Sequence, residues 1–266
     1  MTPNRVVFTD GVLEIPNPFF PGEYTFFRDW KNHGPVNLFQ ALANSSNIYF
    51  FNVGGGFGDV QGLGIARMNE WFKKFGFGKK TGIKEFAEED GFLPTPDWKE
   101  ERFGTPWLIG DTYFTAIGQY AFLVTPLQAV VATSAIANGG LLQRPKLIFE
   151  NQTSGITEIV QEKIDVKDST LEAIREGMRQ TVTLGTTQSL NLPFVRVASK
   201  SGTAERGEDL SKINSWVEGF FPYDEPKYAF VFMAENGPAQ TVQSVSFVPS
   251  RLFQWMNNEG INEYFK

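Results

Sequence analysis

The sequence predicts an α+β fold in which helices flank an antiparallel sheet. Segments 194–198, 215–221 and 228–234 read as strands joined by short connections, a pattern typical of an antiparallel meander. Before them, apolar residues recur at helical spacing, and two such segments begin with capping signals. The chain has 266 residues, 41% of them hydrophobic, and shows no linker or internal repeat, so we expect one domain over residues 1–266.

Composition excludes several classes of protein. The net charge is −6 and no basic run is present, so nucleic acid is not an expected partner. Because the chain has no cysteine, disulfides and thiolate metal sites are excluded, and we expect neither a metal nor a cofactor. Neither a run of 18 apolar residues nor a signal peptide is found, so we expect no membrane-spanning helix.

The N-terminal part combines extended pieces with two buried segments. Three prolines within residues 16–21 prevent a helix, so we expect turns and short strands over residues 1–34. A helical pattern over 36–44 then leads directly into Ser45 and Asn47, and the apolar segment 48–53 follows. Ser45 and Asn47 are therefore expected at a junction between two buried segments.

The middle of the chain carries two predicted helices and a long loop. Apolar residues at helical spacing over 65–75 predict the first helix, which Gly76 ends. Residues 84–115 contain three prolines and two tryptophans, and we expect a long ordered loop there. Thr125, Pro126 and Gln128 form a capping box with proline at the first helical position, which predicts a second helix that ends at 138.

The remainder adds a hairpin, two helices and the sheet. Residues 141–157 read as a hairpin or as a strand followed by a turn. Ser169 and Glu172 form another capping box, which predicts a helix that ends at Gly185. Segment 228–234 is almost wholly apolar, so we expect it to be the central strand, covered on both faces. A short amphipathic helix is expected over 248–256.

The single histidine, His33, lies in a polar stretch between Lys31 and Gly34. A histidine base normally needs a partner that orients it, and no such partner is evident. We therefore expect His33 to be an exposed loop residue rather than a catalyst.

Two polar clusters carry the chemistry of the chain. Ser45-x-Asn47 is the first, and by itself it is better explained by a helix cap followed by a turn. Lys200 opens the second cluster, whose residues are Lys200, Ser201, Gly202 and Thr203. A lysine and two hydroxyls beside a glycine at the end of a strand predict an anion-binding strand edge, whereas a solvated turn is the alternative.

In this order, the two clusters resemble the motifs of the penicillin-binding transpeptidases, in which Ser-x-x-Lys, Ser-x-Asn and Lys-Thr-Gly follow one another. The resemblance extends over nearly all of the chain and is closest to the class B enzymes of the elongation type. It implies the penicillin-recognising serine transpeptidase or β-lactamase-like fold without its N-terminal part. The segments that carry it are 24–31, 41–50, 75–83, 106–111, 117–119 and 125–128.

The resemblance implies a role for each residue of the two clusters. Ser45 would relay a proton between the nucleophile and the leaving group, and Asn47 would hydrogen-bond the substrate amide. Lys200 would add positive potential and keep the relay poised. The hydroxyls of Ser201 and Thr203 would bind the terminal carboxylate of a D-Ala-D-Ala stem peptide or of a β-lactam.

The backbone of the second cluster would also contribute to catalysis. The resemblance implies that the N–H of Thr203 supplies half of an oxyanion hole. Gly202 lacks a Cβ, which would leave room for the acyl group along the strand. A second Lys-Thr-Gly begins at Lys80, but it follows a helix and does not lie at a strand edge, so we expect Lys80 to be a surface turn residue.

The first motif of the family is absent, because no serine of this chain is followed by a lysine three residues later. Without a nucleophile, the covalent route through an acyl-serine is lost. The favoured hypothesis is therefore the C-terminal portion of a peptidoglycan D,D-transpeptidase, inactive alone. A non-catalytic module that binds stem peptide or β-lactam, or that scaffolds a wall-synthesis complex, is a second hypothesis. A relative of serine β-lactamases or β-lactam sensors is a third.

Partners and location are also implied by the resemblance. The family acts on peptidoglycan stem peptides, binds β-lactams, and would work in a wall-elongation complex that includes a glycosyltransferase. It would face the periplasm or outer wall side from the cell membrane, held there by an N-terminal anchor that this chain does not show.

Overall fold

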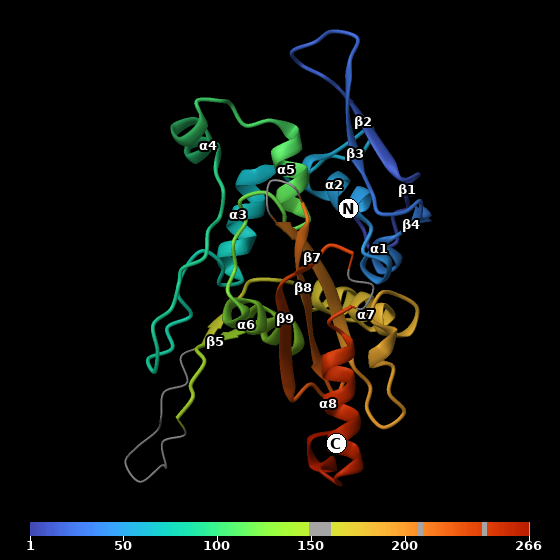
Figure 1. Cartoon of the computed structure of the whole chain (residues 1–266), viewed down its shortest axis with the longest axis vertical. Helices are drawn as coiled ribbons and strands as arrows, with labels where there is room; N and C mark the ends of the chain where they lie inside the picture. The colour runs from blue at the N-terminus through green and yellow to red at the C-terminus, as the bar shows by residue number, and fades with distance from the viewer. Residues whose placement is uncertain (149–160, 207–209, 241–243, 266) are drawn as a thin grey trace.

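The structure, a computed structural model, describes residues 1–148, 161–206, 210–240 and 244–265 (Figure 1). Two short antiparallel strand pairs begin the chain, so the short strands expected over residues 1–34 are confirmed. Helices follow them. The elements up to residue 148 are β1 (Val7–Thr9), β2 (Val12–Pro16), β3 (Tyr24–Arg28), β4 (Gly34–Val36), α1 (Leu38–Asn44), α2 (Asn47–Gly55), α3 (Gly64–Lys74), α4 (Pro96–Phe103), α5 (Ile109–Ala116), α6 (Pro126–Ala137) and β5 (Leu141–Gln143).

The second half of the chain holds the largest sheet, in which β7, β8 and β9 run antiparallel in that order. The predicted meander is therefore confirmed, and Figure 1 shows α8 lying along it. The elements of this half are β6 (Gln161–Lys163), α7 (Asp168–Thr183), η1 (Gln188–Leu190), β7 (Ala198–Arg206), β8 (Lys212–Phe221), β9 (Tyr228–Pro238), α8 (Phe247–Asn258) and η2 (Asn262–Phe265).

Two predictions about this sheet are wrong. The first strand begins at Ala198 and not at 194, so Lys200 and Thr203 lie within β7 rather than at its end. The apolar strand β9 is not central, because among the described strands it pairs with β8 alone and lies at the edge. The expectation that helices cover both of its faces is confirmed: Phe230 belongs to the core beneath α8, and Ala229 packs with the cluster that contains Ala137 of α6.

Alternation along the strands divides the sheet into two faces. Val217 and Phe221 of β8 pack with Phe253 of α8 in one core, which removes their apolar surface from water. On the other face, Phe220 packs with Ala137 of α6 and with residues of α7. Lys200 and Glu218 are opposite each other in the β7–β8 register and belong to this second face, as does the neighbouring pair of Ala198 and Phe220. Hence β7 presents its lysine toward the side of α6 and α7.

The helices confirm some capping predictions and contradict others. Helix α6 begins with the predicted box, in which Thr125 accepts from the N–H of Gln128 and Gln128 reaches back. Helix α7 instead begins at Asp168, so Ser169 is not its cap and the second box is wrong. The expected loop over 84–115 is also wrong, because α4 and α5 form there, the former capped by Thr95.

The other predicted segments agree in part. Helices α1 and α2 meet at the expected junction, α3 covers most of the predicted helix over 65–75, and α8 matches the helix expected over 248–256. Strand β5 pairs with β6, while residues 149–157 of the predicted hairpin lie outside the described residues. Within the described ranges, no helix is both long and apolar enough to cross a membrane.

Candidate active site

Ser45 lies at the junction of α1 and α2, where the chain turns sharply. It is the C-cap of α1 and adopts a left-handed conformation with φ 54° and ψ 48°, and its N–H bonds back to carbonyls of the last turn. Such a conformation is uncommon for a residue other than glycine and persists only where the surroundings hold it. The turn ends the helix at Ser45, a half-buried residue.

The carboxylate of Asp29 holds this junction in place. Its Oδ2 accepts from the hydroxyl of Ser46 at 2.8 Å and from the N–H of Ile48 at 3.1 Å, which satisfies the start of α2. The indole N–H of Trp30 lies 3.2 Å from the carbonyls of both Asn44 and Ser45. Ser46 is fully buried, so it is a structural neighbour of Ser45 and not a second candidate for the proton relay.

The lysine of β7 reaches this junction. Lys200 Nζ donates to Ser45 Oγ at 2.8 Å and to the carbonyl of Ser201 at 2.8 Å. The structure thus brings the two sequence clusters together in one site, although a helix cap and a solvated turn explained each of them separately. An ammonium has only donors, so Ser45 accepts in this bond while Lys200 is charged.

Burial sets the charge state of this lysine. It lowers the pKa of Lys200 to about 8, and the Glu218 carboxylate limits this change because a nearby negative charge favours the ammonium. Burial likewise raises the pKa of Glu218 to about 7, a change that Lys200 and a hydrogen bond with Thr133 oppose. Sequence analysis did not identify Glu218, because the β7–β8 register decides that it faces Lys200.

The segment after α7 connects β7 with the helix junction. Thr186 Oγ1 lies 2.6 Å from Ser201 Oγ, and the N–H of Thr186 donates to the carbonyl of Ala43 at 3.1 Å. Gly185 precedes it, and a Cβ there would stand 2.0 Å from the oxygen of Ala43, so only glycine permits this approach. The hydroxyl of Ser201 is therefore held in place by a residue that the sequence patterns did not indicate.

The far end of the second cluster is open. Thr203 is exposed, and its carbonyl accepts from the side-chain amide of Gln119 at 3.2 Å. Gln119 belongs to the segment 117–119 that carries the family resemblance, but it had no predicted role, and the structure shows that its side chain bonds to this part of β7. At Gly202, a Cβ would stand 3.3 Å from the Cβ of Trp216 on β8, which is a tight contact but not a prohibitive one.

Asn47 is less closely associated with the other candidates. Its side-chain amide donates to the carbonyl of Arg28 on β3, at 3.5 Å, a long hydrogen bond. Asn47 is the first residue of α2 and lies two positions after Ser45, so both residues belong to the junction. The observed contact of its side chain is nevertheless with the β2–β3 hairpin. Its predicted contact with a substrate amide stays a prediction.

Two further predictions concern lone residues. Lys80 is exposed and lies outside helices and strands, as expected of a surface turn residue. His33 lies in a loop, but the expectation that it is exposed is wrong: its side chain is fully buried, with Nε2 3.5 Å from Asp29 Oδ1 and its ring centroid 5.1 Å from that of Trp30. Asp29 and Trp30 enclose it behind the junction.

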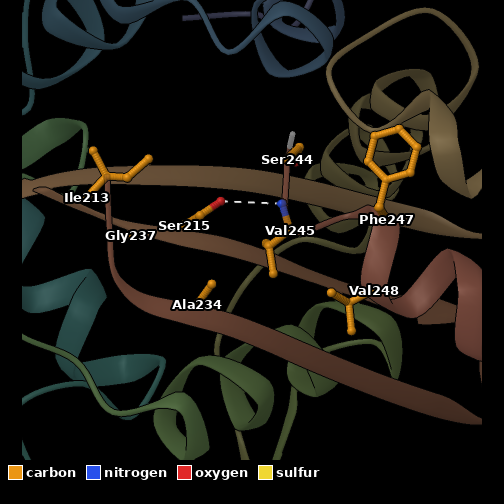
Figure 2. A pocket seen from close by; sticks show the side chains of 8 residues that line it. All are labelled: Ile213, Ser215, Ala234, Gly237, Ser244, Val245, Phe247 and Val248. Carbon is orange, nitrogen blue, oxygen red and sulfur yellow. Dashed lines mark hydrogen bonds between the residues drawn. The ribbon is translucent and has the colours of Figure 1, made fainter. Parts of the chain in front are cut away.

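A separate pocket of about 270 Å³ opens where β8 and β9 meet the start of α8 (Figure 2). Figure 2 shows the N–H of Val245 directed at the hydroxyl of Ser215, 3.4 Å away. The lining contains no titratable side chain and no member of the two clusters, so it offers no acid, base or nucleophile. Its residues are Ile213, Ser215, Ala234, Gly237, Ser244, Val245, Phe247 and Val248.

The family described as the penicillin binding protein transpeptidase domain matches residues 11–248. The chain belongs to this family. The α+β penicillin-recognising fold and the resemblance to elongation-type enzymes are thereby confirmed, since the relatives of this transpeptidase chain include MrdA proteins and its structural neighbours are penicillin-binding proteins.

Three relatives illustrate the likeness. The chain is 32% identical to peptidoglycan D,D-transpeptidase MrdA of Haemophilus influenzae over 260 residues, covering 89% of this chain and 38% of that protein. It is 30% identical to PBP2 of Helicobacter pylori in a complex with MreC, with a TM-score of 0.79, covering 98% of this chain and 46% of that one. It is 27% identical to a chain of a peptidoglycan synthase complex that coordinates polymerization and crosslinking, with a TM-score of 0.78, covering 100% of this chain and 43% of that one. The chain thus spans less than half the length of each.

Proposed function

We propose that this chain forms the stem-peptide-binding side of the cleft of a peptidoglycan D,D-transpeptidase. The hydrogen bond between Lys200 and Ser45 carries the proposal, because it joins the two motifs that a penicillin-binding site requires. Similarity to MrdA supports the substrate class, which is a stem peptide ending in D-Ala-D-Ala. The single-domain organisation over residues 1–266 is part of the same proposal.

The anionic end of the peptide would bind along β7. A half-buried ammonium attracts a carboxylate more strongly than an exposed one, because less water screens it. Thr203 is exposed three residues further along β7, and the hydroxyl of Ser201 is held by Thr186. Lys200 would therefore attract the carboxylate, while the two hydroxyls of β7 would orient it.

Ser45 and Lys200 would form the proton relay of the cleft. Ser45 Oγ accepts from Lys200 Nζ and keeps its own hydrogen for another acceptor, so a proton can pass along this pair. Asn47, on the first turn of α2, would hydrogen-bond the substrate amide. The N–H of Thr203 would stabilise the oxyanion, and Gly202 would leave room for the acyl group.

Acylation itself needs a serine activated by a neighbouring base, and this chain has no Ser-x-x-Lys. We therefore propose that the chain binds peptide and β-lactam reversibly by itself, and that an acyl-serine forms only where a Ser-x-x-Lys element joins the cleft. The same observation favours the second candidate function, which is a purely non-catalytic module for stem-peptide binding.

The wider setting follows from the relatives. PBP2 of Helicobacter pylori forms a complex with MreC, and another similar chain belongs to a peptidoglycan synthase complex. We propose that this chain works in a comparable wall-elongation complex that includes a glycosyltransferase, on the extracytoplasmic face of the cell membrane. Co-purification with candidate partners from a membrane fraction tests this setting separately from peptide binding.

Calorimetry and penicillin labelling test the function together. We expect a peptide ending in D-Ala-D-Ala to bind more tightly than its L-Ala-L-Ala counterpart, and Lys200→Met to weaken this binding. Lys80→Met is the matched control, because Lys80 begins the other Lys-Thr-Gly and is exposed. We expect no covalent labelling by a fluorescent penicillin. Absence of peptide binding would remove the proposal, and covalent labelling would show that a serine of this chain is acylated, which contradicts purely reversible binding.

A further inference from the structure

We propose that Glu218 is a positioning residue that sets the charge state of Lys200 and, through it, the direction of the hydrogen bond between Lys200 and Ser45. Neither sequence motif includes Glu218, which lies on β8 beneath the candidate site. The consequence for ligand binding rests on the function proposed above, whereas the effect on Lys200 itself does not.

The register of the sheet brings the two groups together. Lys200 and Glu218 are direct partners in the antiparallel β7–β8 pair, and both are partly buried. Directly opposed residues project from the same face, with Cβ atoms about 5 Å apart. Glu218 is therefore the neighbour of Lys200 on one side, while Ser45 is its neighbour on the other.

The other elements around the pair offer few charges. Glu218 faces Thr133 of α6, whose hydroxyl bonds to it, and it is opposite the apolar Val231 of β9. In the described part of the chain, Glu218 is the one group whose charge acts appreciably on Lys200. On α7, the charges of Glu176 and Arg179 interact instead with the group formed by Arg196, Tyr223 and Asp224.

The charge of Lys200 decides how it bonds to Ser45. An ammonium has three N–H donors and no lone pair, so Ser45 must accept from it. A neutral amine has a lone pair and can accept the hydrogen of Ser45. An ionised Glu218 favours the ammonium and hence the first arrangement, whereas a protonated Glu218 permits the second. The carboxyl group thus controls which partner holds the proton of the pair.

Thr133 supports the ionised form of Glu218. A hydrogen bond from its hydroxyl favours the carboxylate over the neutral acid. The hydroxyl is almost fully buried, so water does not compete for it. Removing this hydroxyl should therefore lower the pKa of Lys200, as removing the carboxylate does, but by less.

An NMR titration of the lysine side chains in the whole chain tests the proposal, with Lys200→Arg used to assign the Lys200 signal. In Glu218→Gln we expect the midpoint of Lys200 to fall by about one pH unit, because the negative charge on the directly opposed residue is lost. Thr133→Val should produce a smaller fall. If Glu218→Gln folds poorly, Glu218→Asp is the second variant to measure. Because it keeps a carboxylate, its Lys200 midpoint should stay close to that of the unaltered chain.

Glu225→Gln is the matched control, because Glu225 is exposed and follows β8 without facing the pair; its Lys200 midpoint should equal that of the unaltered chain. A midpoint in Glu218→Gln within about 0.2 units of the unaltered chain would overturn the proposal, since an opposite charge at this separation shifts a pKa more than that. The pH profile of peptide binding is the second readout. If the chain binds no peptide but the Lys200 midpoint falls in Glu218→Gln, the proposed function fails and the role of Glu218 stands. If the chain binds peptide but the midpoint does not move, the proposed function stands and the role of Glu218 fails.

Discussion

The Nζ atom of Lys200 lies 2.8 Å from the Oγ atom of Ser45, although 155 positions separate the two residues in the chain. The contact depends on the segment after α7, because Thr186 bonds both to Ala43 of α1 and to Ser201 of β7. The positions of Lys200 and Ser45 relative to each other therefore depend on how α7 and the segment after it pack between α1 and β7.

Gly185→Ala tests this dependence. An alanine Cβ would stand 2.0 Å from the carbonyl oxygen of Ala43, which is backbone and cannot move aside cheaply. We expect the free energy of unfolding to fall by about 3 kcal/mol, as for other substitutions that overpack a core. Urea unfolding followed by circular dichroism measures it.

Gly202→Ala is the control for this substitution. Its Cβ would stand 3.3 Å from that of Trp216, so a shift of a few tenths of an ångström accommodates it. We expect a loss of about 1 kcal/mol or less. Equal losses in the two variants would show that the approach of α7 to α1 is not a tight contact.

Asp29→Ala tests how the junction of α1 and α2 is held. The substitution removes the acceptor of Ser46 and Ile48 and leaves a buried hydroxyl without its partner. We expect a loss of about 2 to 3 kcal/mol, from a lost cap and an unsatisfied buried group.

Asp224→Ala serves for comparison, because Asp224 forms an exposed ion pair with Arg196 and should contribute less than about 1 kcal/mol. If Asp29→Ala costs no more than Asp224→Ala in the same urea experiment, the junction is held by something other than this carboxylate.

Stability should depend on pH through Lys200 and Glu218. The pKa of Glu218 rises from 4.5 to about 7 on folding, so between these values the folded chain binds more protons and stability falls as pH increases. The pKa of Lys200 falls from 10.5 to about 8, so stability rises with pH between 8 and 10.5. The pair should therefore be least favourable near pH 7 to 8, where both groups are charged.

Urea unfolding of the unaltered chain and of Glu218→Gln at pH 5 and pH 7 measures the acidic side of this profile. The stability of the variant relative to the unaltered chain should increase by about 2 kcal/mol between the two values. Glu225→Gln, an exposed carboxylate, should show no comparable change. A constant difference between Glu218→Gln and the unaltered chain would mean that Glu218 titrates as an ordinary glutamate.

Local signals predicted part of the fold and missed the rest for identifiable reasons. The box of Thr125 and Gln128 was sufficient to locate α6, because the cap is formed within four residues. Thr95 and Pro96 carry the same cap-and-proline signal at the start of α4, but the surrounding prolines and tryptophans favoured a loop. The box at Ser169 was wrong because α7 begins one residue before it.

Tertiary relationships set the limit for the site. The two clusters were visible in the sequence, and their resemblance to a known motif set indicated that they meet. The neighbours that hold them were not visible, because Asp29, Thr186 and Glu218 reach them through a hairpin, a helix end and a strand register. The prediction that β9 is central was wrong for a similar reason, since an apolar strand covered by helices on both faces can also lie at the edge of a sheet.

A double-mutant cycle on ligand binding tests the central claim most directly, namely that Ser45 and Lys200 line one groove for the anionic end of a peptide. Calorimetry would compare the unaltered chain, Ser45→Ala, Lys200→Met and the double variant, each with a peptide ending in D-Ala-D-Ala. We expect the two effects to be non-additive by about 1 kcal/mol or more, as for residues in one network. Strictly additive effects, or binding that neither substitution changes, would contradict the claim.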